Sequence, residues 1–368
     1  MPADALSWSP NDGIDALLGP LRAALDGGPA VVIGAPVSSP VPASTAIVLR
    51  TSGSAQGPGR PVALGRDALS ASAHATHDRL GGAGCWVVAL SPTHIGGLQT
   101  VIRSMLAGHP PVRMTSEDFD TAELARTITT APEAPYLSLV PTQLFRALRS
   151  PQAQLALGQC RAVLIGGAAL PPTLAERALD AGIKLVTSYG MTETSGGCIY
   201  DGVPLAHVQV RLAERNRIQI AGPTLMSGYL DEGPQPFYPD GDVRWFGTHD
   251  IGELDSSGRL QVIGRADDML ISGGLNVHPD QVERLLAPLG ELVVVGVPDA
   301  EWGTLVTVVT TTAHSLAAMR EAVGGGPRAP RAVVRVDALP LRGPGKIDRQ
   351  AATTLATRIL GEGGGQRL

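Results

Sequence analysis

The sequence predicts an α/β protein in which a large amino-terminal domain of parallel-type α/β sheets carries a small β-barrel and is followed by a small α+β domain. Short, continuously apolar runs alternate with helical patterns through the first half of the chain, which is typical of parallel strands covered on both faces. The pattern then changes to short strands with frequent turns, and finally to a compact mixture of helices and strands. At 368 residues the chain exceeds the size of one hydrophobic core. We therefore expect two domains, 1–265 and 266–368.

In the first half, each expected strand is a short apolar run, and the longest expected helix covers 66–80. Ligand sites in parallel sheets lie outside the carboxyl ends of the strands. Four unusual sequences follow such ends: TSGS, SPTHIGG, GGAAL and YGMTET. We expect these four loops to converge at one sheet edge and to form one site. The strands are expected at 46–50, 85–90, 136–141, 161–167 and 183–190.

The second half begins with short strands separated by turns, which predict a small antiparallel barrel over 203–264. Beyond Asp267 an α+β domain of ordinary size is expected. The glycine-rich tail, 361–368, is predicted to be disordered. In the last domain, helices are expected at 279–287 and 315–323, and strands at 292–297, 305–311 and 332–336.

Composition excludes several classes of protein. The net charge is −5 and no dense Lys/Arg block occurs, so a nucleic acid is not an expected partner. No apolar run approaches the ~18 residues that span a bilayer, and the amino terminus lacks the pattern of a secretion signal. Unpaired spacing of Cys85, Cys160 and Cys198 predicts free thiols. We expect a cytoplasmic protein with no membrane insertion.

A pair of histidines, His74 and His77, lies three residues apart on the expected helix 66–80. Metal ligation would need a third ligand, and none is in view. Solvated helix positions are the favoured interpretation.

The segment WFGTHDIGELDSSGRLQVIGR (245–265) is the most informative part of the chain. It places Asp250 on a turn and Arg265 fifteen residues later, after an Asp-Ser-Ser-Gly hairpin signal. A fixed acid and a fixed base at this spacing suit a ligand with a diol at one point and charge at another. A solvated hairpin with ordinary surface charges is the alternative.

Two further motifs suit a nucleotide. TSGSAQGPGR (51–60) is a loop of the kind that wraps phosphates with backbone N–H groups and hydroxyls, although a plain flexible loop is as compatible with the pattern. In YGMTET (189–194), a tyrosine can stack on adenine, a threonine hydroxyl can reach the α-phosphate, and Glu193 can hold Mg²⁺ together with substrate phosphates. A carboxylate that stabilises the start of a helix is the alternative for Glu193.

Together these motifs resemble the adenylate-forming superfamily of acyl-CoA synthetases, peptide-synthetase adenylation domains and luciferases. The resemblance extends from about Thr51 to Arg349. It implies that Asp250 grips the ribose hydroxyls and that Arg265 contacts the same nucleotide. It also implies nucleotide-binding roles for Thr51, Ser52, Gly53 and Ser54 of the phosphate loop, with Arg60 as a cation in place of the usual loop lysine, and the roles above for Tyr189, Thr192 and Glu193.

The same resemblance assigns roles to other segments. GGAAL (166–170) would pack the backbone of Gly166 and Gly167 against adenine, unless it is a simple strand-to-helix turn. His94 would gate the acyl pocket, with a core or capping histidine as the alternative. Gly196 and Gly197 would leave room in that pocket for a flat ring. GPTLMSGY (222–229) would support the fold rather than the chemistry.

The resemblance also implies that the small domain is mobile. Asp267, in GRADDMLISGGLNVHPDQVE (264–283), falls at the family's hinge, and Gly273 and Gly274 suit positive φ or close approach to a ligand. Lys346, in PLRGPGKIDR (340–349), matches the adenylation lysine that reaches the carboxylate and the α-phosphate. A solvated loop lysine is the alternative.

Within the superfamily, three segments resemble the short actinobacterial o-succinylbenzoate–CoA ligases of menaquinone synthesis: ATHDRLGGAG, SPTHIGGLQ and YGMTETSGGCIYDGVPL. This resemblance implies a small carboxylic acid, ATP, Mg²⁺ and CoA as ligands, with His94 or Arg103 near the second carboxylate of the acid. Other aryl or fatty acyl-CoA ligases, a stand-alone adenylation domain that loads a carrier protein, and a nucleotide-binding pseudoenzyme stay open as alternatives. The sequence leaves the oligomeric state open, a homodimer included.

Overall fold

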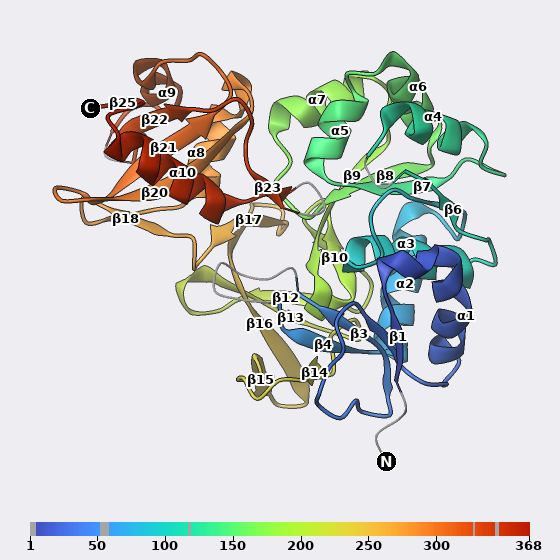
Figure 1. Cartoon of the computed structure of the whole chain (residues 1–368). Coiled ribbons are helices and arrows are strands. Elements are labelled where there is room, and N and C mark those ends of the chain that lie inside the picture. The colour runs from blue at the N-terminus through green and yellow to red at the C-terminus, as the bar shows by residue number, and fades with distance from the viewer. Residues whose placement is uncertain (1–4, 52–58, 117–118, 327, 343–345) are drawn as a thin grey trace. The chain divides into compact units, whose positions relative to one another are not determined.

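The computed structural model describes residues 5–51, 59–116, 119–326, 328–342 and 346–368 (Figure 1). It divides into two compact units. Among the described helices, none has both the length and the apolar character needed to span a bilayer. Unit 1 comprises 1–170, 176–211 and 219–247, and unit 2 comprises 171–175, 212–218 and 248–368. The predicted boundary between 265 and 266 stays a prediction.

The first sheet of unit 1 has the order β1-β2-β3-β4-β14. Strands β1, β2 and β3 are parallel, whereas β4 is antiparallel to both β3 and β14. Strand β3 is buried along most of its length, as its apolar sequence predicts. The elements are β1 (Leu6–Trp8), α1 (Gly13–Leu25), β2 (Val31–Ile33), β3 (Thr45–Arg50), β4 (Pro61–Gly65) and β14 (Gly228–Tyr229), with a short 3-10 turn, η1 (Pro10–Asp12).

The second sheet of unit 1 has seven strands in the order β11-β10-β9-β8-β7-β5-β6. The strands from β6 to β9 are parallel, and β10 and β11 add an antiparallel edge. Strands β5 and β7 are buried throughout, in accord with parallel strands covered on both faces. The strands are β5 (Trp86–Val88), β6 (Val112–Arg113), β7 (Tyr136–Leu139), β8 (Ala162–Gly166), β9 (Leu185–Met191), β10 (Gly196–Tyr200) and β11 (Val203–Pro204).

Helices connect the strands of this second sheet, so the predicted alternation of strand and helix is confirmed. The prediction of four loops at one sheet edge is wrong in one respect. Strand β3, which precedes the TSGS segment, belongs to the first sheet, so three of the four loops share an edge. The helices are α2 (Arg66–Leu80), α3 (Ile95–Leu106), α4 (Thr121–Thr129), α5 (Pro141–Ala147), α6 (Pro151–Gln159) and α7 (Pro172–Asp180).

The strands predicted for a barrel form a sheet of order β12-β13-β16-β15, with β17 beside β16. The pairings among the described strands leave this sheet open, which corrects the prediction of a closed barrel. The predicted hairpin lies at Asp255, whose carboxylate accepts hydrogen bonds from the backbone N–H groups of Ser257 and Arg259. The strands are β12 (Gln209–Leu212), β13 (Arg217–Ala221), β15 (Phe237–Asp240), β16 (Val243–Leu254) and β17 (Leu260–Arg265), with the 3-10 turn η3 (Glu214–Asn216).

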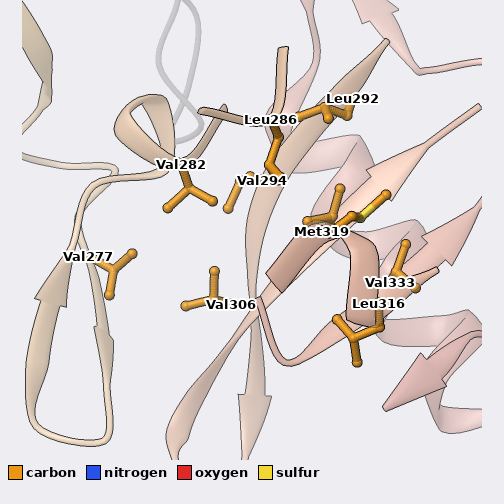
Figure 2. Packing of buried hydrophobic residues seen from close by; sticks show 10 residues of the cluster. Val277, Val282, Leu286, Leu292, Val294, Val306, Leu316, Met319 and Val333 are labelled. Carbon is orange, nitrogen blue, oxygen red and sulfur yellow. The ribbon is translucent and has the colours of Figure 1, made fainter. Parts of the chain in front are cut away.

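Unit 2 contains a four-stranded sheet of order β20-β21-β22-β25. Alternate residues of β20 pack on opposite faces: Val294 lies in one apolar cluster with Leu286 and Met319 (Figure 2), and Val293 lies in another with Ala356. The elements are β18 (Leu270–Ser272), β19 (Leu275–Val277), α8 (Pro279–Leu286), η4 (Ala287–Leu289), β20 (Leu292–Asp299), β21 (Gly303–Thr310), α9 (Leu316–Ala322), β22 (Ala332–Arg335), β23 (Leu341–Arg342), β24 (Lys346–Ile347), α10 (Arg349–Gly361) and β25 (Gln366–Arg367).

The prediction of a disordered tail is wrong. Strand β25 pairs with β22, and the side-chain oxygen of Gln366 accepts a hydrogen bond of 2.9 Å from the backbone N–H of Leu316 at the start of α9. Arg367 forms an ion pair of 2.7 Å with Asp299. The free backbone edge of β22 gives the tail a pairing partner that its glycine-rich composition does not reveal.

Candidate adenylate-forming site

Glu193 is a buried acidic residue near the carboxyl edge of the seven-stranded sheet. It lies in η2 (Thr192–Thr194), the 3-10 turn that follows β9, and its exposed fraction is 9%. Its carboxylate oxygen Oε1 accepts a hydrogen bond of 2.7 Å from the hydroxyl of Tyr229. Its backbone oxygen accepts another, of 2.8 Å, from the N–H of Met226. The segment 226–229 therefore holds both the backbone and the side chain of Glu193.

Tyr229 acts as the hydrogen-bond donor in this pair. Burial raises the pKa of Tyr229, and the adjacent charge of Glu193 raises it further. The phenol therefore keeps its proton and donates it toward the carboxylate. GPTLMSGY (222–229), expected to support the fold, thus also contacts a candidate metal ligand.

Hydrogen bonds within the turn explain why Thr192 and Glu193 adopt a fixed backbone. The Thr194 hydroxyl accepts from the N–H of Met191 at 2.9 Å and lies 2.7 Å from the backbone oxygen of Gly196. Ser195 adopts positive φ, and its backbone oxygen accepts a hydrogen bond from the side-chain amide of Gln99. The Thr192 side chain is buried.

The base of the predicted phosphate loop is closed by Thr51 and Arg60. The N–H of Thr51 donates to the backbone oxygen of Arg60, and the N–H of Arg60 donates to the Thr51 hydroxyl, both at 3.0 Å. Ser52, Gly53 and Ser54 lie outside the described residues, so their predicted phosphate contacts stay predictions.

The Arg60 side chain binds Asp231 through two hydrogen bonds, from Nε at 2.8 Å and from Nη2 at 2.5 Å. A third bond, from Nη1, reaches the backbone oxygen of Pro234. Its guanidinium carbon lies 3.5 Å from the centroid of the Tyr229 ring. The side chain predicted to bind pyrophosphate is therefore already engaged by a carboxylate and an aromatic ring.

The glycines predicted to line the acyl pocket are packed against the chain itself. A Cβ atom on Gly197 would lie 2.1 Å from Oγ of Ser188 and 2.7 Å from Cε1 of Tyr200. On Gly196 it would lie 3.2 Å from Cγ of Gln99. Close packing around β10 thus explains why glycine occupies these two positions. The sequence analysis had expected these glycines to leave open space for a ring.

The other predicted residues of unit 1 lie at strand and helix ends. His94 is half-buried at the N-cap of α3, and its backbone oxygen accepts a hydrogen bond from Leu98. Tyr189 lies in β9, opposite Ile199 of β10. Gly166 ends β8, and Gly167 follows with a φ of 79°. Their roles toward a nucleotide and an acyl group stay predictions.

Arg103 lies in the interior of unit 1, with its guanidinium 4.9 Å from the Trp86 ring and a bond of 3.3 Å to the Tyr200 hydroxyl. His77 is also buried, which corrects its interpretation as a solvated helix position. The indole N–H of Trp86 donates to Nε2 of His77, and burial together with the charge of Arg103 lowers the pKa of His77 to about 4. These residues belong to the core around α2 and α3.

In unit 2, Asp250 and Arg265 lie opposite each other in the antiparallel pair of β16 and β17. Nη1 of Arg265 lies 3.6 Å from Oδ1 of Asp250, and the Thr248 hydroxyl accepts the backbone N–H of Asp250 at 3.0 Å. Asp250 lies inside a strand, so its prediction on a turn is wrong. The strand pairing agrees with the prediction that one hairpin fixes the positions of the acid and the base.

Asp267, the predicted hinge, lies two residues beyond the end of β17 at Arg265. Its carboxylate lies 3.2 Å from Nη2 of Arg265 and 2.9 Å from Nδ1 of His249. Gly273 and Gly274, in the turn between β18 and β19, have φ values of 57° and 76°. This confirms the expectation of positive φ there, whereas the hinge role stays a prediction.

Lys346 begins β24, where its backbone pairs with Arg342. Arg349 anchors the start of the following helix, α10. The sequence analysis did not predict this contact. The Arg349 guanidinium lies 2.7 Å from Oδ1 of Asp280 and 2.5 Å from Oε1 of Glu283, both on α8. Asp280 and Glu283 lie three residues apart in sequence on α8, and this spacing was the signal that could have identified them as partners.

The donor set is compatible with one carboxylate-bound Mg²⁺. Within the described parts of the chain, no group of three or more His, Cys, Asp or Glu side chains is arranged to hold a metal ion. Mg²⁺ in nucleotide sites is typically bound by one or two carboxylates plus substrate phosphates. Glu193, with the Thr192 hydroxyl beside it in sequence, supplies such oxygen donors. Cys85, Cys160 and Cys198 are buried free thiols, and burial raises the pKa of Cys85 to about 11.

Comparison with known proteins identifies the family. The family model described as AMP-binding enzyme matches residues 12–230, more than half of the chain. The chain belongs to the AMP-binding enzyme family. It is 42% identical over 333 residues to a probable 2-succinylbenzoate–CoA ligase from Mycobacterium tuberculosis, a match that covers 86% of this chain and 85% of that protein.

Two solved structures share the fold of this chain. ATP-bound MatB from Rhodopseudomonas palustris matches with a TM-score of 0.76 at 24% identity, covering 96% of this chain and 79% of that one. The o-succinylbenzoate CoA synthetase from Bacillus subtilis, in complex with its acyl-adenylate intermediate, matches with a TM-score of 0.72 at 23% identity, covering 91% and 80%. At these identities the likeness establishes the fold alone, and it confirms the predicted α/β class.

Proposed function

We propose that this AMP-binding enzyme activates o-succinylbenzoate with ATP, through an acyl-adenylate, and transfers the acyl group to CoA. The products are o-succinylbenzoyl-CoA, AMP and pyrophosphate, and the reaction would belong to menaquinone synthesis. One observation carries this substrate: the 42% identity to the mycobacterial ligase extends over 85% of that protein.

The chemistry requires charge compensation. A carboxylate is a poor electrophile, so its oxygen attacks the α-phosphorus of ATP and pyrophosphate leaves. Two like charges ~4 Å apart repel by roughly 4 kcal/mol at an effective dielectric near 20. Protein cations and oriented N–H groups offset this repulsion and stabilise the leaving group. Bound Mg²⁺ would neutralise phosphate charge, and we assign its protein carboxylate to Glu193.

We assign each nucleotide contact to a residue that the motifs indicate. In this proposal Asp250 accepts hydrogen bonds from the ribose hydroxyls, and Arg265 contacts the same nucleotide. Tyr189 stacks on adenine beside the backbone of Gly166 and Gly167. The Thr192 hydroxyl donates to the α-phosphate, and the N–H groups and hydroxyls of 51–54 bind the outer phosphates.

We propose that Lys346 acts in the first half-reaction and that Asp267 permits the change to the second. Lys346 would bind the carboxylate and the α-phosphate during adenylation, where its ammonium stabilises developing charge. It must then withdraw so that the CoA thiol can attack the acyl carbon and release AMP. Rotation about Asp267 would accomplish this change. The proposal includes Mg²⁺ and CoA as ligands. It also includes a cytoplasmic location, where ATP and CoA are supplied, and a homodimer.

Other functions make different predictions. Another aryl or fatty acyl-CoA ligase would convert other acids at least as fast, and a carrier-loading domain would transfer its acyl group to a carrier protein in preference to CoA. A nucleotide-binding pseudoenzyme would bind ATP without turnover. Retention of Glu193, Asp250, Arg265 and Lys346 supports an active enzyme.

The direct test is product formation. Purified protein is incubated with ATP, Mg²⁺, CoA and o-succinylbenzoate, and the products are separated by chromatography and identified by mass. We expect o-succinylbenzoyl-CoA and AMP in equal amounts. Release of ADP, or AMP release without a thioester at saturating CoA, would contradict the proposal.

A further inference from the structure

Glu193 is held at two points by one short segment. The Tyr229 hydroxyl lies 2.7 Å from Oε1 of the Glu193 carboxylate, and the Met226 N–H lies 2.8 Å from its backbone oxygen. A glutamate side chain has three rotatable bonds, so a buried glutamate needs a partner to fix its carboxylate. A hydrogen bond from a neutral hydroxyl to a carboxylate is charge-assisted and stronger than one between neutral groups.

Tyr229 is held in turn by Arg60. Strand β14 pairs with β4 so that Tyr229 lies opposite Val62, two residues beyond Arg60. The Arg60 guanidinium lies 3.5 Å from the centre of the Tyr229 ring and is fixed by its two bonds to Asp231. A cation stacked on an aromatic ring and locked by a bidentate carboxylate restrains the position of that ring.

The same arginine closes the phosphate loop. Its backbone N–H and oxygen are both bonded to Thr51. A continuous series of contacts thus runs from the loop base at Thr51 through Arg60 and Tyr229 to Glu193. Because a metal ion in a nucleotide site binds both phosphate oxygens and a protein carboxylate, the loop and the carboxylate must keep a fixed separation.

We propose that Tyr229 is a positioning residue that orients the Glu193 carboxylate for Mg²⁺·ATP, and that Arg60 acts by holding Tyr229 rather than by binding pyrophosphate. Arg60 would have to leave Asp231 in order to reach a phosphate, and this exchange would break both hydrogen bonds that the aspartate accepts from the arginine. This inference rests on the proposed function, in which Glu193 is the metal ligand.

Tyr229→Phe removes only the hydroxyl. ATP affinity is measured by titration calorimetry in EDTA and over a series of Mg²⁺ concentrations. The Mg²⁺-dependent gain in ATP affinity should fall about tenfold, the effect of one lost hydrogen bond to a charged group, while affinity in EDTA stays unchanged. Tyr238→Phe is the matched control, because Tyr238 is half exposed in β15, and it should behave as wild type.

A double-mutant cycle shows whether Tyr229 acts through Glu193. In the Glu193→Gln background, Tyr229→Phe should have no further effect on Mg²⁺-dependent ATP binding. Additive effects, a Tyr229→Phe titration identical to that of wild type, or wild-type ATP binding that does not depend on Mg²⁺ would each overturn the inference. Unfolding midpoints of all variants are measured in parallel. If Tyr229→Phe lowers the unfolding midpoint but binds ATP with the same Mg²⁺ dependence as wild type, Tyr229 has a structural role and the inference is overturned.

Arg60→Gln separates the two roles of the arginine. As a positioning residue, it should reproduce the Mg²⁺-dependent loss of Tyr229→Phe and add nothing to it. An equal loss of ATP affinity in EDTA and in Mg²⁺ would make Arg60 a direct phosphate ligand and overturn that part. These binding experiments use no acid and no CoA, so they can succeed even if o-succinylbenzoate proves not to be the substrate.

Discussion

Asp250 and Arg265 face each other across the β16–β17 pair, with Oδ1 of Asp250 3.6 Å from Nη1 of Arg265. The aspartate side chain is 13% exposed and the arginine side chain 44% exposed. The same arginine contacts Asp267 at 3.2 Å. The proposed ribose ligand and the proposed hinge residue therefore contact the same cation, Arg265, which links the β16–β17 hairpin to the residue where rotation is proposed.

Asp267→Pro should slow thioester formation more than adenylation. Proline fixes φ near −65° and removes a backbone N–H, so rotation at this position is restricted. ATP–pyrophosphate exchange should continue, while CoA transfer from isolated acyl-adenylate should stall. Asp267→Asn, which keeps backbone freedom, is the control and should transfer the acyl group. Normal overall turnover of Asp267→Pro would place the hinge elsewhere.

Lys346→Ala should reduce the adenylation rate by ~10²–10³-fold, the typical cost of removing one transition-state donor. Thioester formation from supplied acyl-adenylate should survive, because the proposed mechanism has Lys346 outside the site at that step. Single-turnover measurements of each half-reaction separate the two effects. The chain offers one other lysine, the exposed Lys184, and Lys184→Ala should retain both rates. Equal loss in both half-reactions of Lys346→Ala would contradict the two-conformation account.

Glu193→Gln should weaken Mg²⁺-dependent turnover without unfolding the protein. The amide oxygen can still accept the Tyr229 hydroxyl, whereas the charge that attracts the metal is lost. Turnover is measured against Mg²⁺ concentration, and the unfolding midpoint by calorimetry. A large drop in the midpoint, with an unchanged Mg²⁺ requirement, would assign Glu193 a structural role.

The contribution of His77 to the stability of the fold should decline as pH falls from about 6.5 to about 4. The folded-state pKa of His77 is lowered to about 4 by burial, so the unfolded chain takes up a proton in this range before the folded chain does. This stability is fully present above pH ~6.5 and is lost as pH falls through the folded pKa. The difference between an ordinary pKa of 6.5 and the folded-state pKa of about 4 corresponds to at most about 3.4 kcal/mol.

Replacing His77 tests that contribution. His77→Gln, whose amide oxygen can accept the Trp86 N–H, should flatten the dependence of the unfolding free energy on pH between about 6.5 and 4. His74→Gln on the exposed face of the same helix is the control and should keep the wild-type slope. Identical slopes for both variants would show that other groups dominate the acid sensitivity.

The fold was predictable where one segment contains its own signal. Runs such as YLSL (136–139) and LVVV (292–295) consist mainly of apolar residues, and every residue in them is buried. What could not be predicted is pairing between distant segments. The sequence does not reveal that β3 joins β2 and β4 in a separate sheet, or that Gln366 reaches the start of α9.

The site shows the same division. Motifs identified Glu193, Asp250 and Arg265, because each lies in a short segment with a characteristic spacing. Tyr229 and Asp231 were missed as parts of the site because their partners, Glu193 and Arg60, are distant in sequence. The pairing of β14 with β4 brings Tyr229 close to Arg60, and the bond from the Met226 N–H to the Glu193 backbone oxygen brings the same segment to Glu193.

We expect this enzyme to select an acid with two carboxylates. An unpaired anion in a desolvated pocket costs several kcal/mol, so a pocket built for o-succinylbenzoate must contain donors that 4-phenylbutyrate leaves unpaired. The most direct measurement is kcat/KM for acid-dependent ATP–pyrophosphate exchange with o-succinylbenzoate, 4-phenylbutyrate, benzoate and a medium-chain fatty acid. We predict a preference of orders of magnitude, about 10³-fold or more, for o-succinylbenzoate. Equal rates with benzoate or the fatty acid would contradict the assignment of substrate and leave a ligase for another acid.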